Sequence, residues 1–200
     1  MLCAGSLGVS QEAAVLFAAG FAAAAVELLR DRVANDPATG QDAWVMLLEI
    51  LHLTGKRDEF EAMAGRYAAA FDLDRLPAWG FPHHVQTDTT FKLEGTLRRP
   101  ADIEGLFAYG RLRTTVAIDM SHLERIDYAF TGSFCAALRM FHQQGKRVIL
   151  ANIGETHAAL LEAAASMDNL VLLRRWRPGH QGRHAQTERW AAPAELEQAA

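Results

Sequence analysis

Three short apolar runs, separated by segments with helical spacing, constrain the fold of the second half of this chain. Each run contains at least three consecutive apolar residues, which is typical of strands that are buried on both faces. The runs lie at 115–120, 147–153 and 170–173, with helical patterns at about 129–144 and 157–165 between them. Strands that alternate with helices predict an α/β fold with a largely parallel sheet backed by helices.

A further strand and helix are expected just before the first of these runs. Phe91, Leu93 and Leu97 indicate a strand. Pro100 then opens a short helical pattern, because proline is well tolerated in the first turn of a helix. The α/β region is therefore expected to begin near residue 89.

In residues 10–72 apolar residues recur at helical spacing throughout, which predicts an all-α region. Gly20 and Gly55 each separate two apolar helical segments, and they are 35 residues apart, close to the period of tetratricopeptide hairpins. The second hairpin places two apolar sets on opposing faces: Trp44, Leu47, Leu48 and Leu51 against Phe60, Met63, Ala64 and Tyr67. These residues are interpreted as core, and a concave peptide-binding surface is the alternative.

The order of these patterns predicts four parts: a tetratricopeptide-like helical region (1–76), a linker (77–88), the α/β region (89–175) and a flexible basic tail (176–200). Pro77, Gly80 and Pro82 mark the linker. From residue 174 to 190 there are five arginines and one acid. The tail is interpreted as solvated, and binding to nucleic acid or an anionic membrane is the alternative.

Composition narrows the classes of protein. With 50% hydrophobic and 22% charged residues the chain is globular, and a net charge of −4 excludes a general nucleic-acid binder. Two cysteines exclude a disulfide framework and a Cys-rich zinc site. No apolar run is long enough for an integral membrane segment, and no basic residue precedes Arg30 as a secretory signal requires, so a cytoplasmic protein is expected.

The most informative stretch is VAIDMSHLERIDYAFTGSFC, residues 116–135. A buried strand is followed by a loop, by an aspartate at a helix start and later by a glycine turn into the next strand. This order resembles the STAS domain, which sulfate transporters and anti-sigma factor antagonists share. The resemblance covers about residues 88–175 and implies a non-catalytic, regulatory protein-binding module.

The resemblance also assigns individual positions. Asp127 matches the aspartate of the family motif, and Tyr128 falls at its first serine. Ala129 falls at the second serine, the one that is phosphorylated in regulated antagonists, so the usual phosphoacceptor is missing. Thr131 and Ser133 are the nearby hydroxyls that remain as alternative phosphoacceptors.

Physical reasoning about the same helix start predicts that Asp127 is its N-cap. The predicted partner-binding surface is this corner together with the preceding loop: Asp127, Tyr128, Ala129, Phe130, Ser121, His122 and Glu124. Tyr128 and Phe130 would form an aromatic contact patch there. The alternative for Phe130 is a place under the N-terminal helices.

No nucleophile, metal or nucleotide motif stands out, and neither a metal nor another cofactor is expected. Cys135 is predicted to point inward, and His83 and His84 are adjacent and so face opposite ways on a strand. We therefore expect no enzyme, but a bacterial adaptor or anti-sigma antagonist-like module with a protein partner and no nucleic-acid partner. Residues 44–67 also resemble, weakly, the helical segment of FimV-like proteins, which supports protein binding.

Two alternatives stay open. The chain resembles the STAS subunit of phospholipid-transport ABC complexes, which also lacks the paired serines, so the partner is either a kinase-like anti-sigma factor or a transport ATPase. The other alternative is a nucleotide-binding protein or enzyme that uses the Asp127 helix start as an anion site. Self-association is left open.

Overall fold

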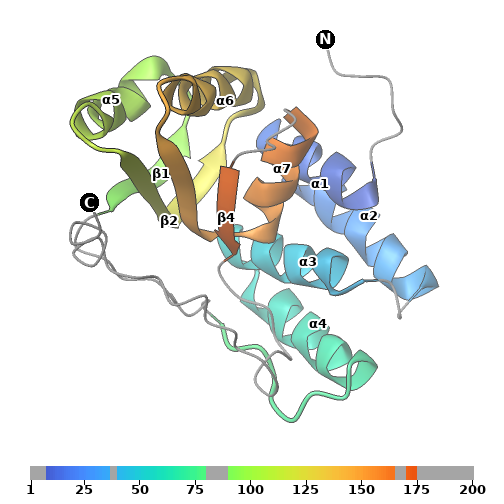
Figure 1. The fold of residues 1–200 in the computed structure, drawn as a ribbon. Coiled ribbons are helices and arrows are strands. Elements are labelled where there is room, and N and C mark those ends of the chain that lie inside the picture. Colours follow the sequence, from blue (N-terminus) through green and yellow to red (C-terminus); the bar gives the residue numbers. More distant parts are fainter. Residues whose placement is uncertain (1–7, 37–39, 80–89, 165–169, 175–200) are drawn as a thin grey trace.

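The structure, a computed structural model, describes residues 8–36, 40–79, 90–164 and 170–174 (Figure 1). The predicted tail, 176–200, and most of the predicted linker, 77–88, lie outside the described residues. The elements follow in the order α1 (Val9–Ala18), α2 (Ala22–Asn35), α3 (Gln41–Leu53), α4 (Arg57–Ala70), β1 (Phe91–Leu97), η1 (Pro100–Ile103), α5 (Glu104–Gly110), β2 (Thr115–Ile126), α6 (Tyr128–Gln143), β3 (Arg147–Ile153), α7 (Glu155–Ala164) and β4 (Leu170–Arg174).

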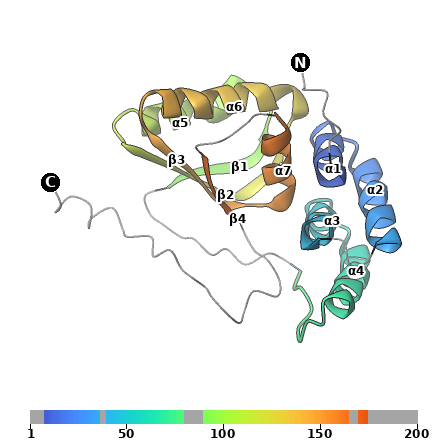
Figure 2. The same cartoon turned by 45° about the vertical axis from the view of Figure 1, so that its right-hand side comes forward.

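The described strands form one parallel sheet in the order β1-β2-β3-β4. Because each strand lies beside the next one in the chain, right-handed connections bring α5, α6 and α7 to the same face. Figures 1 and 2 show these helices together on that face. Val116, Ile118, Val148 and Leu150 point into the core beneath them and are buried. The α/β fold with a largely parallel sheet is confirmed.

The helical region packs as two hairpins beside α7. Trp44 of α3 contacts Tyr67 of α4, with ring centroids 5.9 Å apart, so the two opposing faces expected from the sequence meet. α1 and α3 both lie along α7 (Figure 2). Residues 155–161 of α7 are buried throughout as a result.

A single carboxylate joins the two regions at the start of α7. The N-cap of α7 is Gly154, which has no side chain to satisfy the first amides of the helix. Glu49 of α3 supplies the missing acceptors: Oε1 accepts from the Glu155 N–H at 3.1 Å, and Oε2 accepts from the Thr156 N–H and hydroxyl, both at 3.0 Å. Glu49 is only 4% exposed. The helical region is thus bonded to the sheet unit in its interior.

A buried polar contact fixes β2 where it leaves β3. Asp119 Oδ1 accepts from Asn152 Nδ2 at 2.9 Å and from the Ser121 N–H at 3.0 Å. Asn152 adopts a φ of +54°, a left-handed conformation that asparagine tolerates better than most residues. β2 pairs with β3 only up to Asp119, and beyond it continues along β1.

Candidate functional site at the β2–α6 corner

The candidate site is the corner where β2 ends and α6 begins. The predicted loop after residue 120 is corrected here, because β2 continues to Ile126 and pairs with β1 across two register shifts. Ser121, His122 and Glu124 therefore lie on a strand. Ser121 is half-buried, and the other two are exposed. Pairing with β1 explains why these polar positions are extended although their sequence is not apolar.

The N-cap prediction for Asp127 is confirmed. Its backbone is extended, and its Oδ1 accepts from the Ala129 N–H at 3.0 Å. Its own N–H donates to the Leu97 carbonyl at the end of β1, at 2.8 Å. The carboxylate already lies against the positive end of α6, so this helix start offers less attraction to a second anion.

The outer face of α6 begins with an aromatic residue and continues with small ones. Tyr128 is 40% exposed. Ala129, Gly132, Ser133 and Ala136 are also exposed along the same helix. Another molecule could approach the backbone of α6 closely here, because no long side chain stands in the way.

Two of the predicted site residues are corrected. Phe130 is 4% exposed, so it belongs to the interior rather than to the predicted contact patch, and Thr131, 2% exposed, is not accessible as the alternative phosphoacceptor. The Thr131 hydroxyl donates to the Asp127 carbonyl at 3.0 Å. An enzyme could phosphorylate Thr131 only if the first turn of α6 opened. Ser133, by contrast, is exposed.

Cys135 lies in the core on the inner side of α6. Burial raises the pKa of its thiol, which lowers the thiolate fraction at neutral pH and disfavours a nucleophilic role. Within the described ranges, no group of three or more His, Cys, Asp or Glu side chains could hold a metal ion. Across the same ranges, every helix falls short of the length and apolarity that a bilayer span requires.

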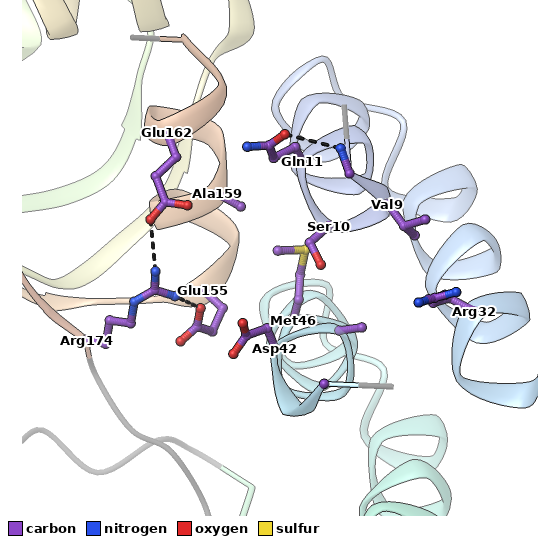
Figure 3. A pocket seen from close by; sticks show the side chains of 13 residues that line it. Val9, Ser10, Gln11, Arg32, Asp42, Met46, Glu155, Ala159, Glu162 and Arg174 are labelled. Carbon is purple, nitrogen blue, oxygen red and sulfur yellow. Dashed lines mark hydrogen bonds and ion pairs between the residues drawn. The ribbon is translucent and has the colours of Figure 1, made fainter. Parts of the chain in front are cut away.

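A pocket of about 430 Å³ lies elsewhere, between α1, α3, α7 and β4 (Figure 3). Its charged lining is largely paired within the protein. Arg174 bonds Glu155 and, at 2.9 Å, Glu162, and Figure 3 shows its guanidinium lying along α7. Arg32 lies 3.8 Å from Asp36. The candidate site is therefore the corner rather than this pocket.

Sequence reasoning missed three residues: Phe21 and Arg125, which lie beside the corner, and Glu49, which joins the helical region to α7. Phe21, in the turn between α1 and α2, is 62% exposed. Arg125 reaches that turn from β2: its Nη1 would lie 3.7 Å from a Cβ at Gly20. Glu49 bonds α7 from a helix more than 100 residues away in the chain. Of these residues, only Phe21 could have been recognised from the nearby sequence, because it directly follows Gly20, which marks a turn.

Comparisons with known proteins identify the fold family. A family profile described as the STAS domain matches residues 19–174, which is most of the chain and includes part of the helical region. Searches among curated proteins and among solved structures found no significant match. The profile match, the parallel sheet and the Asp127-capped helix agree, and the chain belongs to the STAS domain family.

Proposed function

We propose that this chain is a non-catalytic adaptor that binds another protein through the β2–α6 corner. The observation that carries the proposal is the outer face of α6, where Tyr128 is exposed beside Ala129 and small side chains continue along the helix. Exposed aromatic residues are typical of interface centres, and the small side chains beside Tyr128 let a partner approach the helix closely. His122 and Glu124 on β2 form the polar edge of this surface.

Control of binding by phosphorylation at residue 129 is not available, because alanine has no hydroxyl. Binding is therefore constitutive or controlled elsewhere on the chain. Ser133 remains a candidate phosphoacceptor because it is exposed on the same face. Mass spectrometry of the native protein tests this: stoichiometric phosphate on Ser133 would show that the control has moved by one helical turn.

The nucleotide-binding alternative has less support at this corner. Asp127 already bonds the Ala129 amide, so a phosphate at the helix start would have to displace or lie beside a carboxylate. The transport-ATPase alternative concerns the identity of the partner rather than the surface. Identification of the protein that binds the corner decides between a transport ATPase and another partner.

The test is photo-crosslinking at position 128, with a control at Leu112. Leu112 is 93% exposed and precedes β2, at the opposite end of that strand from Tyr128. A photoreactive phenylalanine at 128 should capture one protein in the cells that make this chain, and the same group at 112 should not. Tyr128→Asp should abolish binding of that protein once it is purified. Equal capture at both positions, or unchanged binding by Tyr128→Asp, would refute the proposed surface.

A further inference from the structure

The turn between α1 and α2 lies directly beside the β2–α6 corner. Figures 1 and 2 show the end of α1 next to the start of α6. Gly20 of this turn has a φ of +92°, and a Cβ there would be 3.7 Å from Arg125 Nη1. The helical region and the sheet unit thus meet at Arg125, which connects two surfaces that are far apart in the sequence.

Arg125 carries a positive charge at this junction without an anionic partner among the described residues. Its Nε is buried and has no hydrogen-bond acceptor, and its side chain forms no ion pair in those ranges. Of the acids next to it in sequence, Glu124 is exposed, and Asp127 bonds the start of α6. A half-buried guanidinium that lacks a carboxylate is costly in the free protein and is well suited to receive one from outside.

Exposed aromatic residues stand on both chain segments that meet at Arg125. Phe21 directly follows Gly20 and is 62% exposed, and Tyr128 is 40% exposed. Tyr128 is three residues beyond Arg125, so their Cα atoms are at most about 11 Å apart. An arginine with aromatic neighbours is the composition that most often dominates the binding energy of protein interfaces.

We propose that the partner-binding surface continues from the corner onto the α1–α2 turn, and that Arg125 receives a carboxylate from the partner protein. This inference rests on the proposed function and adds the chemistry of the partner: an Asp or Glu side chain flanked by apolar residues that contact Phe21 and Tyr128. A protein fits better than a small anion, because the aromatic residues come from two separate segments. The partner must therefore contact both regions of the chain at once.

The test places a photoreactive phenylalanine at 21, at 128 and at the control position 112 in the full chain. Capture of the same identified protein at 21 and 128, but not at 112, is expected. Capture at 128 alone refutes this inference and leaves the proposed function standing. Capture at 21 alone refutes the proposed corner, and capture at neither position refutes both.

The carboxylate contact is then measured with the purified captured protein. Arg125→Gln and Phe21→Ser should each weaken its binding about tenfold or more, because a charge-assisted bond and an aromatic contact are lost. Arg139→Gln, which changes an exposed arginine farther along α6, is the matched control and should leave the affinity unchanged. Phe21→Ser tests the surface independently of folding, because the Phe21 side chain is exposed.

Charge reversal identifies the contact itself. Arg125→Glu should abolish binding, and an Asp→Arg or Glu→Arg change at the matching position of the partner should restore it. Unchanged affinity in both Arg125→Gln and Phe21→Ser, with thermal midpoints like that of the wild type, would overturn the inference.

Discussion

The first amides of α6 and those of α7 obtain their hydrogen-bond acceptors in two different ways. Both helices follow a parallel strand, and both need acceptors for their first amides. α6 takes its acceptor from Asp127, the residue just before it, at a half-buried position. α7 begins after a glycine and takes its acceptors from Glu49, a buried residue on another helix.

The difference distinguishes the start of α6, which lies at the surface, from the start of α7, which joins the helical region to the sheet unit. The α6 start is satisfied locally, so its outer face is left free to meet another molecule. The α7 start is satisfied only when α3 lies against it, so the same bonds hold the helical region in place. The following substitutions test this contrast, from the largest expected effect to the smallest.

Glu49→Ala should destabilise the protein most. It leaves two amides and a hydroxyl at the start of α7 without their acceptor in the interior, and we expect a loss of about 3 kcal/mol or more in the free energy of unfolding. Urea denaturation measures the loss. Glu61→Ala is the control, because Glu61 forms an exposed pair with Arg57 and should cost less than about 0.5 kcal/mol. Similar losses in the two variants would contradict the role of Glu49 as a joint.

Gly154→Ala should cost about 2 kcal/mol, because a Cβ at this position would lie 2.7 Å from Glu49 Oε1. In a Glu49→Ala background most of this cost should disappear, and a double-mutant cycle measures the coupling. Gly65→Ala is the matched control, since its Cβ would meet nothing within 4 Å and a helical alanine should stabilise by about 0.5–1 kcal/mol. Additive effects of Gly154→Ala and Glu49→Ala would argue against their contact.

Thr156→Val should cost about 1.5 kcal/mol, because it removes one hydrogen bond to the Glu49 carboxyl group and keeps the shape of the side chain. Thr131→Val is the counterpart in α6: it is equally buried, but its hydroxyl donates only to a carbonyl of its own helix. Thermal or urea unfolding should therefore rank Thr156→Val as the more damaging change. The reverse order would show that the two helix starts do not differ as described.

Asp127→Ala should have the smallest effect on stability, about 1 kcal/mol, which is typical for loss of an N-cap. Asp127→Asn should keep most of that stability, since an amide oxygen can also accept from the Ala129 N–H. Unfolding curves of the two variants, measured beside Glu49→Ala, provide the comparison. A loss at Asp127 as large as that at Glu49 would remove the distinction between the two helix starts.

Sequence reasoning predicted the features whose causes are local. Consecutive apolar residues predicted β3, and an aspartate followed by apolar residues at helical spacing predicted the start of α6. Phe130 lies four residues before Phe134, and helical spacing puts both on one side of α6, where both are buried. The sequence left two places open for Phe130, an exposed aromatic patch at the corner and a place under the N-terminal helices, because its spacing does not say which elements pack against it.

Features that depend on distant partners could not be predicted in the same way. The second half of β2 is polar at Ser121, His122 and Glu124, and it is extended because β1 pairs with it. Glu49 stands in an apolar helix without any local sign of its partner, since the amides that it bonds belong to a backbone 106 and 107 residues away. Arg125 was expected in a loop, and nothing near it in the sequence indicated that it lies on β2 beside Gly20 of the α1–α2 turn.

Because Glu49 bonds the first amides of α7, we expect that any fragment of this chain that folds alone must include α3. A fragment starting at residue 90 would keep the four described strands, yet the first amides of α7 would lack the Glu49 acceptor, and the side of α7 that α1 and α3 cover would be exposed. A truncation near residue 89, where the sequence pattern changes from all-α to α/β, would thus remove part of the buried interior. We therefore expect the helical region to behave as a layer of the sheet unit, which covers α7, and not as a separate module.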